Sequence, residues 1–293
     1  MQARLPPQFN MLALVRRIQP RDSELTAAKT HQLVVRTRLL SSFDISRYIS
    51  IGSHARKTAI RTHSDLDALV VVRRNEAKWG GSIVSSETLL RRVILDLKGR
   101  FPQSDIRGDR QAAVVHFSGG QESLDVVPAL WARFSGGRPV YGIADGDGGW
   151  FETSPEAHQR FFTAADLRSA GKLRGVAQLL RWWKYARSSP LPISSFHADM
   201  LFAESGICQG AKSYGNCLYS AFRELSSREC RPLRDPVGIA GLIPATRTKA
   251  QLDILIAAVD HALRHSQAAL AAESVSDHPE ANRQWNIVFN GTF

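Results

Sequence analysis

The sequence predicts an α+β fold with two lobes, and two observations support this prediction. Strand-like apolar runs crowd residues 48–127, whereas the chain beyond Trp150 is dominated by helical patterns. No internal repeat and no low-complexity linker separates these two stretches. We therefore expect an α/β lobe over about residues 1–150 and a mostly helical lobe over about residues 151–293, with a ligand cleft between them.

The first lobe is predicted to begin with a long helix and to continue as a sheet. Ser23 is a suitable N-cap, and an apolar face that includes Leu33 and Leu39 continues to about Phe43. Residues 87–97 have the periodicity of an amphipathic helix. Turn residues predict a turn at 118–120 and a hairpin with loops within 135–150. The strand signals lie at residues 48–51, 67–72, 106–117 and 124–127.

The second lobe is predicted from helix signals alone. Pro155 follows Ser154, and proline is favoured at the first position of a helix. A strong helical pattern over residues 170–187 ends at Ser188, Ser189 and Pro190. Three further segments have helical patterns, at residues 195–204, 216–225 and 248–272.

Composition narrows the class of protein without fixing its function. The chain has 293 residues, 43% of them apolar and 22% charged, which is ordinary for a globular protein with a sizeable core. Its net charge of +11 favours anionic partners such as triphosphates or nucleic acid. The three cysteines, Cys208, Cys217 and Cys230, have no zinc-finger spacing, so we expect free thiols in a reducing compartment. The apolar run near the N-terminus is short and broken by arginines, and no run is long enough to span a bilayer, so we expect a cytoplasmic protein.

Three aspartates predict a metal site. Asp65 and Asp67 are two residues apart at the start of an apolar run, so on a strand both side chains would point to the same face. Asp125 starts another apolar run and would join them from an adjacent strand. Carboxylates suit hard cations, and two such cations can clamp the attacking hydroxyl and the leaving pyrophosphate of an in-line displacement. We therefore predict that these aspartates bind two Mg²⁺ ions, for which Mn²⁺ is a possible substitute.

The alternative is that Asp65 caps a turn and Asp67 is an edge-strand charge, since an Asp-x-Asp pair alone is common. The metal site is favoured because the pair follows a strand that ends at Gly52 and Ser53, and because Asp125 sits in an otherwise buried strand. Gly52 allows a ligand to approach the backbone closely, and the amides after it open toward a helix N-terminus that can hold phosphate. Ser53 can add a hydroxyl donor.

Gly-Ser followed by Ser-Asp-x-Asp resembles the pattern of the polymerase-β-like nucleotidyltransferase superfamily. Further segments are similar to bacterial cyclic-oligonucleotide synthases, the CD-NTases of CBASS anti-phage operons, which are relatives of animal cyclic GMP-AMP synthase and oligoadenylate synthetase. These segments are ALVVV at 68–72, SLDVVPA at 123–129, DGDGGWFETSPEAH at 145–158, LLRWWK at 179–184 and PISSFH at 192–197. The resemblance covers about residues 51–236. It implies a nucleotidyltransferase lobe with a mixed sheet and helices, a mostly helical second lobe, and an active site in the cleft between them.

The resemblance also implies roles for individual residues. Asp65, Asp67 and Asp125 match the acidic residues that bind two Mg²⁺, and Gly52 and Ser53 match the turn that holds the donor triphosphate. Further phosphate contacts are implied for a basic residue, Arg181 or Lys184, and for Ser194 or Ser195. Lys57 and Thr58 stand where many superfamily members have Gly-Thr, a departure that should leave the metal site intact.

The resemblance predicts a cyclic di- or trinucleotide synthase that uses nucleoside triphosphates, ATP or GTP among them, and signals through a diffusible second messenger to a downstream effector in antiviral defence. A linear nucleotidyltransferase, which would add nucleotides to RNA, protein or a small molecule, is the runner-up. A degenerate binding protein is a third possibility, against which the intact acidic trio argues. We expect no membrane partner, and nucleic-acid binding is possible but not required. The sequence leaves open the choice of base, the ring size, the linkage, any activating partner and the oligomeric state.

Overall fold

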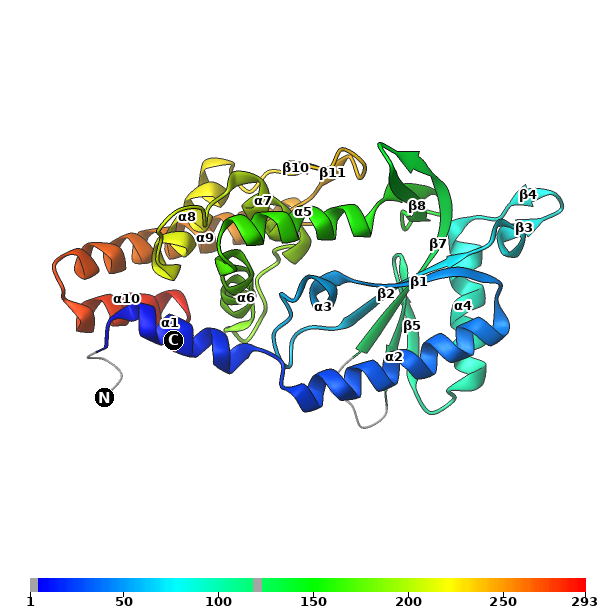
Figure 1. The fold of residues 1–293 in the computed structure, drawn as a ribbon, viewed down its shortest axis with the longest axis horizontal. Coiled ribbons are helices and arrows are strands. Elements are labelled where there is room, and N and C mark those ends of the chain that lie inside the picture. Colours follow the sequence, from blue (N-terminus) through cyan, green and yellow to red (C-terminus); the bar gives the residue numbers. More distant parts are fainter. Residues whose placement is uncertain (1–4, 118–122) are drawn as a thin grey trace. The chain divides into compact units, whose positions relative to one another are not determined.

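The computed structural model describes residues 5–117 and 123–293, and these form two compact units (Figure 1). One unit is Pro20–Arg160, and the other joins the segment up to Gln19 to Phe161–Phe293. The predicted lobes divide the chain at a different place. The first helix, α1 (Pro7–Ile18), packs on helices of the second unit, whereas β9 (Trp150–Thr153) pairs with the sheet of the first. The functional roles given to the lobes stay predictions.

The unit Pro20–Arg160 is built on a mixed seven-stranded sheet in which β1, β2, β7, β6 and β5 lie side by side in that order. β2 and β7 are parallel, and the other pairs are antiparallel. The second half of β7 leaves this row to pair with β8, which pairs with β9. The strand bounds are β1 (Ile45–Ile51), β2 (Leu66–Val72), β5 (Asp105–Asp109), β6 (Ala112–His116), β7 (Ser123–Ser135) and β8 (Arg138–Ala144). A separate hairpin joins β3 (Lys78–Trp79) to β4 (Ser82–Ile83).

The two faces of this sheet differ, and the difference decides where a site can form. α2 (Asp22–Ser42) and α4 (Ser86–Arg100) cover one face (Figure 1), where Val35, Leu39 and Val93 join the larger apolar cluster. The opposite face carries a smaller apolar cluster that includes Leu69 and Val127. Asp67 and Asp125 belong to this second face, because side chains two residues apart on a strand point the same way. Three helical segments complete the unit, α3 (Gly52–Arg56), the 3-10 turn Arg74–Ala77 and the start of α5 (Pro155–Arg168).

The second unit is mostly helical. α9 (Lys249–Ser274) packs against α8 (Tyr214–Ser227) and α10 (His278–Val288), and α1 contacts α6 (Lys172–Tyr185) and α8. Its core holds fully buried Trp183 and Phe222, with ring centroids 5.2 Å apart. α7 (Ser195–Ser205) and a two-residue ladder between β10 (Leu233–Arg234) and β11 (Leu242–Ile243) complete it. None of the helices in residues 5–117 and 123–293 combines the length and apolar character needed to cross a bilayer.

The predicted α+β class is confirmed, and most predicted helices lie within a few residues of the observed bounds. The region 106–117 is a hairpin of two strands, because Arg110 turns the chain with a positive φ of 51°. α1 and α10 were not predicted. α1 has the i, i+3, i+4, i+7 spacing of a helix at Met11, Leu14, Val15 and Ile18, whereas α10 offers few apolar residues. The predicted turn at 118–120 lies outside the described residues.

Candidate active site

The register of the sheet places the acidic residues beside the turn at Gly52 and Ser53, which is predicted to hold phosphate. Asp67 on β2 lies directly opposite Asp125 on the parallel strand β7. On its other side, Asp67 pairs with Ile51, the last residue of β1 before Gly52. Two carboxylates and the Gly-Ser turn, which are up to 73 positions apart in the sequence, therefore meet at one edge of the sheet.

The turn and the Asp67 carboxylate approach each other most closely at Gly52. Its φ is +69°, a left-handed conformation that only glycine adopts without strain. A β-carbon at this position would lie 1.8 Å from Asp67 Oδ2, inside the carboxylate itself. The turn continues into α3, which ends at Lys57 with a φ of 58°, also left-handed. A glycine would adopt this φ more easily than the lysine present here.

Asp65 lies just before β2, exposed, and is oriented by Ser123. Ser123 is 5% exposed, and its hydroxyl donates a 2.7 Å hydrogen bond to Asp65 Oδ1. One carboxylate oxygen of Asp65 is thereby fixed and the other is left for a ligand. Ser123 is not among the site residues predicted from the sequence. It stands two residues before Asp125 on the same strand face, and that spacing was the available signal.

The pKa of Asp125 reflects the closeness of the other carboxylates. Burial, and then the charges of Asp67, Asp65 and Asp109, raise the pKa of Asp125 to about 7. Asp109 is an exposed carboxylate of β5 that the sequence analysis did not include. Ionised carboxylates this close repel one another, and a bound cation is the usual way to relieve that repulsion.

The donor chemistry fits a hard divalent cation, although the side chains are not gathered around one point. Within residues 5–117 and 123–293, no three histidine, cysteine or acidic side chains are grouped tightly enough to hold a metal ion. Asp65 is turned to Ser123, and Asp67 to the Gly52 backbone. To share an ion, the side chains of Asp65, Asp67 and Asp125 would have to adopt other rotamers.

The predicted phosphate contacts belong to the second unit, and here the structure changes the prediction for Arg181. Its side chain is 4% exposed and forms a bidentate pair with Asp199 of α7, at 2.9 and 2.8 Å. A further bond joins Arg181 Nη1 to the Ala177 carbonyl at 3.1 Å. A guanidinium buried and bonded in this way holds two helices together and is not available to a triphosphate, so we do not retain Arg181 as a phosphate contact.

Lys184 and Ser195 remain candidates. Lys184 is half-buried, and its Nζ bonds to the Ile193 carbonyl at 3.0 Å, which brings the amine beside the start of α7. Burial, and then the positive charges of Arg181 and Arg247, lower the pKa of Lys184. An anion would therefore be favoured at this position. The Ser194 hydroxyl already caps α7 by accepting from His197 N at 3.3 Å, whereas half-buried Ser195 is the first helical residue.

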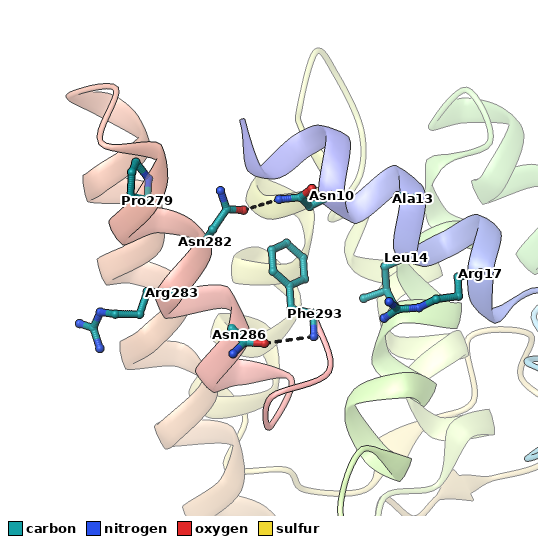
Figure 2. Close-up of a pocket in the computed structure, with 9 residues that line it drawn as sticks. All are labelled: Asn10, Ala13, Leu14, Arg17, Pro279, Asn282, Arg283, Asn286 and Phe293. Carbon is teal, nitrogen blue, oxygen red and sulfur yellow. Dashed lines mark hydrogen bonds between the residues drawn. The ribbon is translucent and has the colours of Figure 1, made fainter. Parts of the chain in front are cut away.

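A cavity and a pair of histidines in the second unit do not have the side chains of a metal-dependent nucleotide site. A cavity of about 340 Å³ opens between α1 and α10, and its polar groups bond to the protein itself, as Asn10 does to Asn282 at 2.7 Å (Figure 2). No aspartate or glutamate side chain is among its lining residues. On α9, the rings of His261 and His265 lie 4.5 Å apart at a spacing that could chelate a metal. Burial and the positive charge nearby, including that of Arg264, lower the pKa of His261, and such surroundings disfavour a cation.

Known proteins share both sequence and fold with this chain. Residues 6–165 match the family model of the Second Messenger Oligonucleotide or Dinucleotide Synthetase domain, SMODS. The cyclic AMP-AMP-AMP synthase of Escherichia coli (strain MS 115-1) is 24% identical over 222 residues, which span 73% of this chain and 66% of that relative. The chain thus spans slightly less than two thirds of this curated relative's length.

Solved structures show the same architecture over most of the chain. E. coli MS115-1 CdnC, in a complex with HORMA-deltaN, has a TM-score of 0.74 at 19% identity, over 100% of this chain and 99% of its own. Vibrio cholerae DncV, a cyclic AMP-GMP synthase in complex with nonhydrolyzable GTP, has a TM-score of 0.62 at 17% identity, over 84% and 68% respectively. At these identities the likeness establishes a shared fold.

Proposed function

Because this chain belongs to the family of Second Messenger Oligonucleotide or Dinucleotide Synthetase domains, we propose that it joins nucleoside triphosphates into a cyclic di- or trinucleotide. Each step releases pyrophosphate. The observation that carries the proposal is the register of β2 and β7, which sets Asp67 opposite Asp125 and beside the Gly52 turn. Relatives named as cyclic AMP-AMP-AMP and cyclic AMP-GMP synthases support ATP as one of the substrates.

In this proposal Asp65, Asp67 and Asp125 hold two Mg²⁺ ions, which supply charge neutralisation at the reacting phosphate and at the leaving pyrophosphate. The backbone amides after Gly52, with the Ser53 hydroxyl, bind the donor triphosphate at the start of α3. Lys184 and Ser195 contribute the phosphate contacts of the second unit, where a fixed positive charge stabilises the departing pyrophosphate.

The chemical step is an in-line displacement at the α-phosphate of the donor nucleotide. An oxygen–phosphorus bond forms to the acceptor hydroxyl as the bond between the α-phosphate and the bridging oxygen breaks, and pyrophosphate leaves. Asp125 is proposed to accept the hydroxyl proton, as a carboxylate placed beside the attacking hydroxyl can. Repetition gives a linear intermediate that still carries a triphosphate, and a last transfer within that intermediate closes the ring.

The diffusible product is proposed to act on a downstream effector in anti-phage signalling, so that the synthase itself needs neither a membrane nor bound nucleic acid. The cation excess of the chain, +11, suits small polyanionic substrates and intermediates.

The test is incubation of the purified protein with the four nucleoside triphosphates and Mg²⁺, then with ATP alone. We expect a product that resists phosphatase and has the mass of two or three joined nucleoside monophosphates without terminal phosphates. Asp67→Asn should abolish it, whereas Asp105→Asn, a matched change at an exposed position of the same sheet, should not. A series of linear products that phosphatase degrades would instead identify a linear nucleotidyltransferase. Transfer of nucleotides to added RNA would also contradict the proposal of a cyclic product.

A further inference from the structure

The turn proposed to hold the donor triphosphate, α3, is a short element with little support of its own. α3 has five residues, starts at Gly52 and stops at left-handed Lys57. None of its residues is buried, and no side chain caps its N-terminus. Isolated helices shorter than about 12–15 residues are marginal in water, so a single helical turn must be held in place by its surroundings.

One such support comes from α5, a helix that is distant from α3 in the sequence. Gln159 of α5, 104 positions further along, donates from Nε2 to the Ala55 carbonyl of α3 at 3.1 Å. The last carbonyls of a helix lack intrahelical partners, so a donor from another element can fix the end of the turn. Gln159 thus contacts the backbone of the turn.

The start of α5 is attached to the sheet by side-chain contacts, and these contacts keep Gln159 in place. Tyr141 of β8 is fully buried, and its hydroxyl donates to Glu156 Oε1 at 3.1 Å. Arg47 of β1 forms an ion pair with the same Glu156 oxygen at 2.8 Å. Glu156 and Gln159 are three residues apart, so they lie on neighbouring positions of one helix face. The Ser154 hydroxyl, just before α5, also donates to a carbonyl of β8 at 2.7 Å, so the helix start has more than one attachment and keeps Gln159 in place when the one at Glu156 is weakened.

We propose that Gln159 is a positioning residue for donor-nucleotide binding: its amide holds α3 in the conformation in which the amides after Gly52 face the triphosphate. This inference rests on the proposed function. Without the bond, the turn would occupy that conformation for only part of the time. The apparent affinity for the nucleotide falls by that fraction, whereas turnover at saturation is preserved.

Two substitutions isolate the donor. Gln159→Met keeps the length of the side chain and removes the amide, and Gln159→Glu keeps the shape and replaces the donor by an acceptor that repels the Ala55 carbonyl. We expect each to raise the KM for ATP by about 3–10-fold, the equivalent of one lost hydrogen bond. The dissociation constant of a nonhydrolysable ATP should rise by the same factor, and kcat should change by less than about 2-fold.

Glu156→Gln is the matched control, since it weakens the attachment of the same helix and leaves the Gln159 donor intact. We expect it to lower the melting temperature with little change in KM. Hydrogen exchange of the peptide over residues 51–60 gives a readout that is independent of nucleotide. Exchange there should increase in both Gln159 variants and not in Glu156→Gln.

If both Gln159 variants lower the melting temperature as Glu156→Gln does, with KM and the exchange of residues 51–60 unchanged, the role is merely structural and the inference is wrong. That outcome differs from a failure of the proposed function, in which the wild-type protein itself would not bind the ATP analogue or would make no cyclic product. In that case both the function and the positioning role fall.

Discussion

Gly52 lies so close to Asp67, one of the carboxylates proposed to bind metal, that a change at either residue affects the other. The absence of a side chain at Gly52 is what leaves room for Asp67 Oδ2. The positive φ at Gly52 adds a second requirement for glycine. Any other residue would have to displace either the carboxylate or the backbone that is proposed to bind phosphate.

Gly52→Ala is expected to reduce activity by at least about 100-fold, because a shift of about 1 Å at a reacting centre has effects of that size. Gly137→Ala is the matched control. Gly137 has a φ of +71° in the same unit, and a β-carbon there would meet nothing within 4 Å. It should lose about 1–2 kcal/mol of unfolding free energy from backbone strain and keep its activity. Equal activities for the two variants would contradict the proposed role of the turn.

Asp125→Asn should separate catalysis from stability. The folded pKa of Asp125, about 7, is raised above the ordinary value of 3.8. As pH rises between these values the unfolded chain loses this proton first, so the carboxyl lowers the stability of the metal-free protein progressively. Above about pH 7 the full penalty is present, and below about pH 4 it vanishes.

The variant should therefore unfold at a higher temperature than the wild type at about pH 8 without metal, with about 1–3 kcal/mol more unfolding free energy, and be inactive. The difference should disappear near pH 4, where both side chains are neutral. Saturating Mg²⁺ should also narrow it, by stabilising only the wild type. A variant less stable than the wild type at both pH values would mean that Asp125 is not electrostatically strained.

At the scale of elements, α6 carries two basic residues, Arg181 and Lys184, whose side chains have different surroundings. Arg181 and Asp199 form a buried pair that joins the helices, with side chains 4% and 1% exposed. Lys184, almost one turn further along α6, is half-buried. Its amine donates to the Ile193 carbonyl and lies 5.0 Å from the centroid of the Tyr185 ring. Arg181 therefore stabilises the fold, and Lys184 is the proposed phosphate contact.

Arg181→Met is expected to lower the free energy of unfolding by about 3–5 kcal/mol, because Asp199 would be left charged and buried. The double variant Arg181→Met with Asp199→Leu should recover most of that loss. Lys184→Met should change stability little and raise the KM for ATP by about 10–100-fold, as expected for a charged hydrogen bond worth about 1.5–3 kcal/mol. Chemical denaturation and initial-rate kinetics measure the two effects. An unchanged KM in Lys184→Met would remove that residue from the site.

At the scale of the whole molecule, no covalent or metal crosslink is expected to hold the fold. Cys208, Cys217 and Cys230 are all buried and free. Burial raises the pKa of the Cys230 thiol to about 12. A hydrogen bond that the Cys208 thiol donates to Cys217, with burial, raises the pKa of Cys208, and the same bond lowers the pKa of Cys217. The protonated thiols of Cys208 and Cys230 are therefore poor ligands and poor nucleophiles.

The melting temperature should therefore shift by less than about 1 °C when a reductant or a zinc-selective chelator is added, since neither changes a folding contact. Scanning calorimetry in matched buffers measures this. A large fall with the chelator would reveal a structural zinc ion, and a fall with the reductant a disulfide.

The sequence by itself determined the class of fold, the family and most of the elements of the candidate site. Periodicity separates the sheet-bearing part from the helical part because each element must bury one face, and that requirement is local. Gly52, Asp65, Asp67 and Asp125 could be selected because their spacing relative to strand ends is also local. The resemblance to cyclic-oligonucleotide synthases is confirmed by the SMODS match over residues 6–165.

Only the tertiary structure decided which side chains are engaged elsewhere. The sequence could not reveal that Arg181 is paired with Asp199, that Ser123 orients Asp65, or that Gln159 holds the turn. Each of these contacts joins residues 18 to 104 positions apart. A polar side chain looks equally available in every sequence context, and its availability depends on whether folding brings a partner within hydrogen-bonding distance and removes the water that would otherwise compete.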